Sequence, residues 1–321
     1  MSPFSPLIGQ PRAVELLTQA VTQQRIAPAY LFAGPPGVGR SFAALCFVEY
    51  LFSPQGSRSA QSLQNRIRQR NHPDLLWVEP TYLHQGKRLS TAEAIAAGIK
   101  RKTPPVIRLE QIREISQFLS RSALEAPRSV VVLEHAETMA EAPANALLKT
   151  LEEPGQATLI LIANGSESLL PTLVSRCQRI PFFRLSPDAL TQVLQTTGHA
   201  DLLQHPPILQ LAQGSPGEAI AHWQNLQELS PELLQSVSQP PRSHREALSL
   251  ARQINQAIAP ESQLWLIDFL QHRYWQPHAL PSHSLKQTVV QLQLLEKARD
   301  YLLQNVNPRL VWEVTLMKMV S

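Results

Sequence analysis

The stretch Gly34-Pro35-Pro36-Gly37-Val38-Gly39-Arg40-Ser41 decides the fold of this chain. Its spacing matches the phosphate-loop pattern, in which two glycines five residues apart precede a Lys and a hydroxyl residue, except that an Arg stands at the Lys position. Glycines have no Cβ, so they let successive backbone N–H groups turn toward an anion at the N-terminus of the following helix. Because the apolar residues 29–33 precede the loop and the apolar residues 41–52 follow it, the stretch predicts a buried strand, a phosphate loop and a buried helix.

Two polar residues later in the chain extend the loop into a candidate nucleotide site. Glu134 follows the β-branched run 129–133, at the position where phosphate-loop ATPases hold an Asp for magnesium, often followed by a Glu that positions the attacking water. Glu134 can still hold magnesium through water, but His135 cannot replace the second carboxylate in the same geometry. Asn164 stands at the carboxyl end of another β-branched run, 158–163.

We therefore predict a degenerate nucleotide site. The planar fork of Arg40 does not reproduce the compact ammonium of a Lys between two phosphates. The sequence leaves open whether ATP or ADP with magnesium binds there, and we do not expect this chain to hydrolyse ATP. The alternative interpretation of His135 is a solvent-facing residue after a strand. The predicted site consists of Gly34, Gly37, Gly39, Arg40, Ser41, Glu134 and Asn164.

Strand and helix patterns alternate along the first part of the chain, ending with a strand candidate at 180–183. This alternation predicts a parallel sheet covered by helices on both faces. From Ser186 onward no convincing strand pattern remains, and Gln239-Pro240-Pro241 marks a break between helical stretches. We expect an α/β domain over residues 1–180, a small helical domain over 181–228 and an all-α domain over 229–321.

Composition excludes several classes of protein. The 321 residues carry 29 basic and 25 acidic side chains, and this weak net charge of +4 does not by itself indicate nucleic-acid binding. Only two cysteines occur, Cys46 and Cys177, too few for a disulfide framework or a cysteine zinc site. We expect a reducing, cytoplasmic compartment. The first ten residues lack the pattern of a signal peptide, and no apolar run approaches the ~20 residues of a membrane span.

Eight motifs in order resemble the AAA+ clamp-loader family, and within it the delta-prime subunits of bacterial DNA polymerase III. The resemblance covers the whole chain. It implies a RecA-like AAA+ module, a small helical lid and a C-terminal helical collar through which five subunits form a broken ring. The motifs are Ile8-Gly9-Gln10, the loop from Gly34 to Ser41, His72-Pro73-Asp74, Ile112-Arg113, residues 145–154, Leu170-Pro171-Thr172 with Ser175-Arg176-Cys177, Gly214-Ser215-Pro216-Gly217 and residues 305–313.

Ser175-Arg176-Cys177 is the most specific of these motifs. The resemblance implies that Arg176 points out of its own subunit into the ATP site of a neighbour. There a fixed guanidinium would act as an arginine finger, which stabilises charge on the transferring γ-phosphoryl group and raises the rate by ~10³ or more. The alternative interpretation is a salt bridge on the domain surface.

Three departures from the family pattern weaken the nucleotide site of this chain and leave the donated arginine intact. Arg40 replaces the Lys, Glu134 and His135 replace the acidic pair, and Glu218 stands near the place where active relatives carry a phosphate-sensing Arg. This combination favours delta-prime over the ATP-hydrolysing gamma or tau subunits, which are the alternative. Many delta-prime chains carry a four-cysteine zinc module after the phosphate-loop helix, but residues 53–71 contain no Cys, so no zinc is expected.

The resemblance also implies the partners. They are the gamma or tau subunits, a clamp-opening delta subunit, the sliding clamp and primed DNA within the assembled loader. The chain would then serve the DNA polymerase III assembly without turning over ATP itself. A scaffold that binds through its collar helices and has no role in nucleotide chemistry is a third interpretation.

Overall fold

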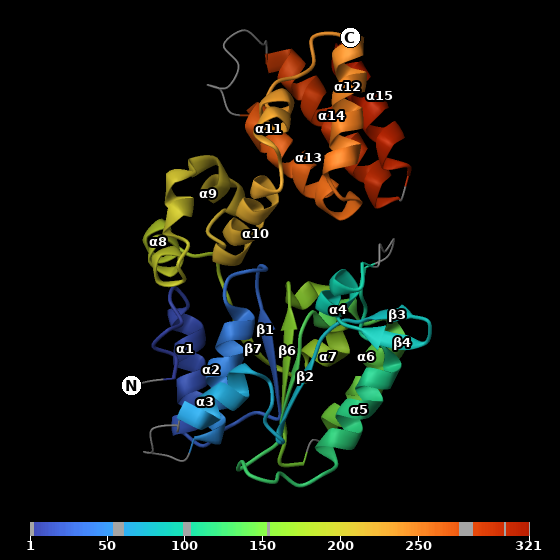
Figure 1. Ribbon diagram of the computed structural model, residues 1–321. Helices are drawn as coiled ribbons and strands as arrows, with labels where there is room; N and C mark the ends of the chain where they lie inside the picture. The colour runs from blue at the N-terminus through green and yellow to red at the C-terminus, as the bar shows by residue number, and fades with distance from the viewer. Residues whose placement is uncertain are drawn as a thin grey trace. The chain divides into compact units, whose positions relative to one another are not determined.

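The computed structural model describes residues 3–53, 61–98, 104–152, 155–275, 285–304 and 306–320. The chain divides into two compact units, Met1–Val193 and Leu194–Ser321 (Figure 1). The three predicted domains, with boundaries at residues 180 and 228, stay a prediction.

A five-stranded parallel sheet forms the centre of the first unit. Its strand order is β2-β5-β6-β1-β7, and each neighbouring pair is parallel. The three inner strands are buried almost throughout, as their β-branched and apolar runs require. The predicted α/β class with a parallel sheet is therefore confirmed. The strands are β1 (Ala29–Ala33), β2 (Leu75–Val78), β5 (Val130–Leu133), β6 (Thr158–Ala163) and β7 (Gln178–Pro181).

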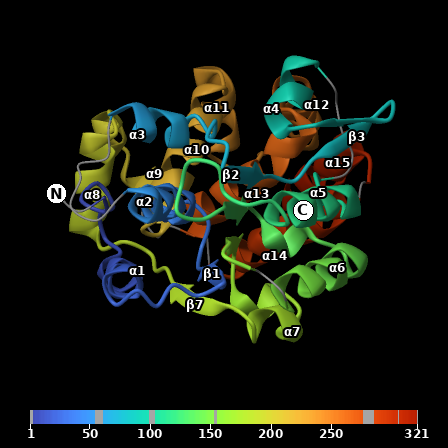
Figure 2. The same ribbon diagram turned by 90° about the horizontal axis from the view of Figure 1, so that it is seen from below.

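Helices cover both faces of this sheet, as Figure 2 shows. On one side, Phe47 of α2 packs edge-on against Tyr30 of β1, with ring centroids 5.1 Å apart. On the other side, Ile115 of α5 and Leu147 of α6 belong to one buried cluster with the strands. The first side carries α1 (Pro11–Thr22), α2 (Arg40–Phe52) and α3 (Gln61–Arg68), and the second carries α5 (Leu109–Leu119), α6 (Glu141–Glu152) and α7 (Pro171–Val174).

A small hairpin and a short helix stand between β2 and α5. The hairpin consists of β3 (Tyr82–His84) and β4 (Lys87–Leu89), and its turn places Gln85 and Gly86 at positive φ. The helix α4 (Thr91–Ala96) begins with a capping box in which Ser90 and Glu93 bond each other's backbone N–H groups. Two short 3₁₀ turns, η1 (Ala136–Thr138) and η2 (Ser166–Ser168), follow β5 and β6.

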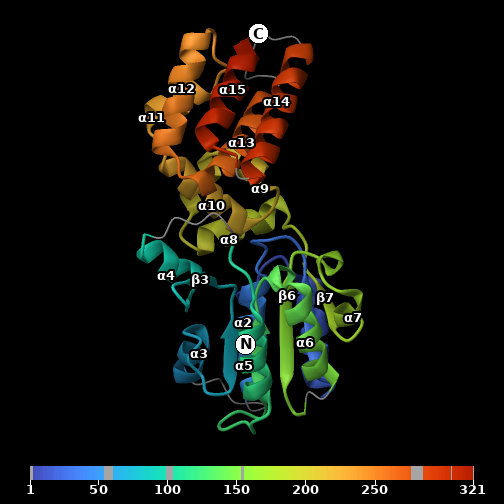
Figure 3. The ribbon, with the colours of Figure 1, turned by 90° about the vertical axis from the view of Figure 1, so that its right-hand side faces the viewer.

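The described part of the second unit consists of helices joined by turns and loops, with no strand. Helices α12, α14 and α15 pack side by side, with α13 against α14 (Figure 3). Trp312 is fully buried there and donates a hydrogen bond to Gln263 Oε1 at 2.8 Å. A helix α8 (Pro187–Thr196) spans the boundary between the units. The others are η3 (Ala200–Gln204), α9 (Pro206–Ala212), α10 (Pro216–Gln227), α11 (Pro231–Val237), α12 (His244–Ala257), α13 (Pro260–Trp275), α14 (Leu285–Leu303) and α15 (Pro308–Val320). Over the described residues, none of the helices has the length and apolar character needed to cross a membrane.

Candidate functional site

The phosphate loop joins β1 to α2, as the sequence predicts. Gly37 and Gly39 adopt φ values of +71° and +97°, in the left-handed region that favours glycine. Gly34 is required for a different reason: a Cβ at this position would lie 2.3 Å from the backbone oxygen of Phe182, just after β7. The glycines therefore give the loop its shape, and Arg40 begins the helix that follows.

Gln10 fastens this loop to the edge of the sheet. Its buried side-chain amide donates hydrogen bonds to the backbone oxygens of Val38, at 3.2 Å, and Phe183, at 2.7 Å. The Phe183 N–H in turn donates to Gln10 Oε1 at 3.1 Å. Sequence reasoning treated Ile8-Gly9-Gln10 only as a motif before a helix and missed this role. No local signal shows it, because Phe183 lies far along the chain.

Arg40 turns its guanidinium onto the end of β6. The residue is only 6% exposed, and it donates hydrogen bonds to the backbone oxygen of Ala163 and, at 3.1 Å, to Asn164 Oδ1. Burial lowers the pKa of this guanidinium, while the charges of Glu137 and Glu134 act in the opposite direction. The fold thus brings together two of the predicted site residues, Arg40 and Asn164, as donor and acceptor.

Glu134, the acidic residue after β5, also lies close to a charged partner within the protein. Glu134 is nearly buried, and its Oε2 lies 3.9 Å from Arg70 Nη2. His135 is about half exposed and lies 3.5 Å from Glu137 Oε1, and this contact raises the pKa of the imidazole against the effect of burial. Sequence reasoning assigned no role to Glu137; its place soon after a strand end was the available signal.

The arrangement keeps the shape of a phosphate loop but alters its chemistry. A magnesium triphosphate site needs a cation aimed at the phosphates and a carboxylate available to the metal. Here Arg40 is directed to β6, and Glu134 is within ion-pair distance of Arg70. These residues do not fit such a site as they stand, so we derive no catalytic step in this chain's own loop.

Arg176 and the phosphate loop lie at opposite ends of two neighbouring parallel strands, β7 and β1. Strand β7 runs parallel to β1, with Gln178 level with Tyr30 and Pro181 level with Ala33. Arg176 precedes β7, whereas the loop follows β1. At about 3.3 Å per residue, the paired stretch alone separates the two by more than about 10 Å. Arg176 is therefore positioned away from its own phosphate loop.

The side chain of Arg176 is held by two acceptors on the surface. It donates to the backbone oxygen of Thr172 at 3.1 Å and to Glu152 Oε1 at 3.3 Å, and it is 41% exposed. Ser175 Oγ donates to the same Thr172 oxygen at 3.1 Å. Burial raises the pKa of the Cys177 thiol to about 11, so this cysteine is not a reactive thiolate. In the single chain Arg176 thus forms the surface ion pair, and its role toward a neighbour stays a prediction.

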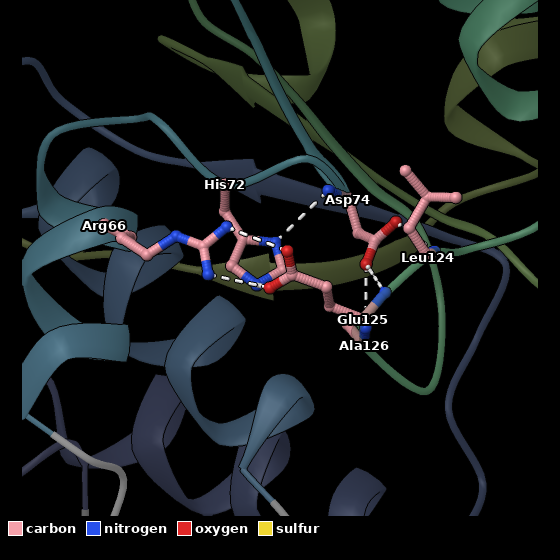
Figure 4. A network of polar contacts seen from close by, with 6 residues as sticks. All are labelled: Arg66, His72, Asp74, Leu124, Glu125 and Ala126. Atoms are coloured by element: carbon pink, nitrogen blue, oxygen red, sulfur yellow. Dashed lines mark hydrogen bonds and ion pairs between the residues drawn. The ribbon is translucent and has the colours of Figure 1, made fainter.

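The His72-Pro73-Asp74 motif has a structural role. The Asp74 carboxylate accepts hydrogen bonds from the backbone N–H groups of Leu124, Glu125 and Ala126, each at 2.7 Å (Figure 4). Burial alone would raise the pKa of Asp74, but these donors hold it below its usual value. Arg66 and Glu125 close the network through two hydrogen bonds of 2.7 and 3.2 Å.

Other predicted features lie apart from this site. Glu218 is at the start of α10, where its N–H donates to Ser215 Oγ at 3.3 Å and its carboxylate lies 3.8 Å from His222 Nε2. Within the described ranges, no group of three or more His, Cys, Asp or Glu is placed to hold a metal ion. The predicted absence of zinc stays a prediction, because residues 54–60 of the stretch concerned, 53–71, lie outside the described ranges. Residues 153–154 of the 145–154 motif lie outside them as well.

Family comparison covers nearly the whole chain. The family described as "DNA polymerase III, delta subunit" matches residues 9–186. The family described as "Cyanobacterial DNA polymerase III delta prime, C-terminal domain" matches residues 188–319. The two matches divide the chain close to the boundary between its two compact units.

Similar individual proteins point to the same family. The Bacillus subtilis DNA polymerase III subunit delta' is 34% identical over 185 residues, which are 56% of this chain and 50% of that protein, so the alignment spans half of its length. The Escherichia coli subunit delta' is 30% identical over 255 residues, 75% of this chain and 68% of that one. The crystal structure of a gamma subunit-related protein from Thermotoga maritima shares the fold, with a TM-score of 0.57, 19% identity and coverage of 96% and 98%. The chain therefore belongs to the delta-prime subunit family of bacterial DNA polymerase III.

Proposed function

We propose that this chain is a clamp-loader subunit that lends Arg176 to the ATP site of an adjacent gamma or tau subunit. The observation that carries the proposal is the placement of Arg176 before the amino end of β7, at the opposite end of the strands from its own phosphate loop. A guanidinium there can reach a triphosphate only in another protomer. Its exposure leaves it accessible to such a partner.

The altered phosphate loop supports the same division of roles. Arg40 is buried and bonded to Ala163 and Asn164, so the side chain at the Lys position is directed to the protein itself. We propose that this loop does not hydrolyse ATP, whether or not ATP or ADP binds there with magnesium. Catalysis would then take place in the neighbour, and this chain would contribute the finger.

The proposed partners are the gamma or tau subunits, a delta subunit and, in the assembled loader, the sliding clamp and primed DNA, all in the cytoplasm. The C-terminal helices offer surfaces for assembly. Val289 and Val290 of α14 and Leu310 of α15 are 44%, 51% and 53% exposed, so a protein contact here would bury apolar surface favourably. Assembly through these helices would hold this chain in a complex with its neighbours.

The experiment is the ATPase of the reconstituted complex with Arg176→Ala. We expect the DNA- and clamp-stimulated rate to fall by roughly a third or more, because one of the three ATPase subunits proposed for the ring loses its finger. Assembly and the melting temperature should be unchanged. Arg179→Ala is the matched control, because Arg179 is a nearby exposed arginine that bonds the Ser166 hydroxyl instead.

Two results would contradict the proposal. An unchanged rate in an intact Arg176→Ala complex removes the finger. Sustained phosphate release by the isolated chain would instead favour the alternative, an ATP-hydrolysing subunit of the gamma or tau type.

A further inference from the structure

Arg176 needs a fixed orientation to serve a neighbouring site, and the loop that carries it does not supply one by itself. The residue follows the short helix α7 and precedes the edge strand β7, so its backbone lies between regular elements. An arginine side chain with several free torsions loses much rotamer entropy when it docks. Contacts that hold it beforehand reduce this loss.

We infer that Glu152 is a positioning residue for Arg176, an inference that rests on the proposed function. Glu152 is the last residue of α6, and its Oε1 accepts from Arg176 Nη2 at 3.3 Å. The second acceptor, the backbone oxygen of Thr172, belongs to α7 and accepts from Nη1 at 3.1 Å. Two acceptors from different helices fix the plane of the guanidinium, whereas one would leave it free to rotate.

The contacts leave donors available for a phosphate. A guanidinium has five N–H groups in a fixed fork. Thr172 and Glu152 engage one each, so three remain, including one on each terminal nitrogen. The arginine can therefore keep both contacts while it approaches a triphosphate.

Folding stability does not explain this ion pair. Glu152 is 58% exposed and Arg176 41% exposed, and ion pairs of this kind contribute little to stability. A carboxylate that is dispensable for folding but bonded to the finger is suited to orienting it. Loss of Glu152 should then affect the rate of the chemical step more than the affinity for ATP.

The test is a graded series in the reconstituted complex. A glutamine side chain keeps a neutral acceptor and an alanine side chain has none. Glu152→Gln should therefore lower the stimulated kcat a little, and Glu152→Ala should lower it more. We expect Glu152→Ala to lose about half of the difference between wild type and Arg176→Ala, with KM for ATP within about twofold of the wild-type value. Glu141→Ala is the matched control, because Glu141 is an exposed glutamate at the other end of α6.

A double variant separates positioning from a general structural effect. Glu152→Ala combined with Arg176→Ala should be no slower than Arg176→Ala alone, because Glu152 acts only through the arginine. A wild-type kcat in Glu152→Ala, or a further loss in the double variant, would overturn the inference while leaving the finger in place. An unchanged rate in Arg176→Ala would overturn the finger and the positioning role together.

Discussion

At the scale of single residues, Arg40 shows how one substitution changes the use of an inherited loop. Its guanidinium is longer and wider than an ammonium and has five donors that must be satisfied when buried. Ala163 and Asn164 at the end of β6 supply acceptors, and Glu134 and Glu137 supply opposite charge. The residue that would hold phosphates in an ATPase becomes a link between α2 and β6.

We predict that Arg40→Ala destabilises the first unit. The variant removes one buried and one partly buried hydrogen bond and leaves a void beside β6, which should lower the free energy of unfolding by about 1–3 kcal/mol. Urea unfolding followed by circular dichroism measures the change. Arg12→Ala is the control, because Arg12 forms an exposed ion pair with Glu15 and should alter stability by less than about 0.5 kcal/mol. Equal effects of the two variants would contradict a linking role for Arg40.

At the scale of elements, Asp74 holds the loop that leads into β5. The carboxylate stands at the start of β2 and accepts three N–H groups from residues 124–126, which lead toward β5. The backbone of that loop has few regular partners of its own, so the carboxylate satisfies donors that burial would otherwise leave unpaired. The motif thus aligns two neighbouring strands.

We predict that Asp74→Asn lowers the free energy of unfolding by about 2–3 kcal/mol at pH 7, because a neutral amide is a weaker acceptor and presents only one oxygen. The pKa of Asp74 is lowered in the folded state, so the wild-type advantage is complete above the unfolded pKa of about 3.9. It decreases as the pH falls below that value and the folded carboxylate is protonated. Urea titrations at pH 7, 5 and 3.5 measure this difference. A gap between wild type and variant that stays constant down to pH 3.5 would refute the assignment.

At the scale of the whole molecule, the chain combines a sheet-based unit with a helical one. The first unit holds the phosphate loop at the carboxyl end of β1 and Arg176 before the amino end of the neighbouring strand β7. The second contains a helical core around Trp312 and exposes apolar side chains on α14 and α15. A subunit that acts through its neighbours needs both features: a group to offer, and a surface that keeps the neighbours in place.

We predict that Val290→Asp weakens association with the other clamp-loader subunits by about tenfold or more, because a charge would have to be buried in an apolar contact. The melting temperature should change little, since Val290 is half exposed in the single chain. Mass photometry or analytical ultracentrifugation of the mixed subunits measures assembly. Leu83→Asp, at an equally exposed position in the β3–β4 hairpin, is the control. Assembly of Val290→Asp at wild-type concentrations would exclude this surface.

Local patterns predicted much of the fold. The strands at 29–33 and 158–163 were predicted with the bounds that the structure shows. The last strand was predicted at 180–183 but lies at Gln178–Pro181, so that prediction was wrong by two residues. The reason is tertiary: the Phe183 N–H bonds the side chain of Gln10, and pairing with β1 ends at Pro181.

The sequence by itself determined the alternation of strands and helices, the glycine loop and the family, because periodicity and backbone requirements act over a few neighbouring residues. It also marked Arg40, Glu134, Asn164 and Arg176 as candidate site residues, and their roles toward a nucleotide stay predictions. Only the tertiary structure decided what they contact. The strand order β2-β5-β6-β1-β7 sets Arg40 beside residues more than a hundred positions away, and the parallel direction of β1 and β7 places Arg176 at the far end of the strands from its own loop. No local pattern encodes such contacts, since they arise from which strands become neighbours when the sheet assembles.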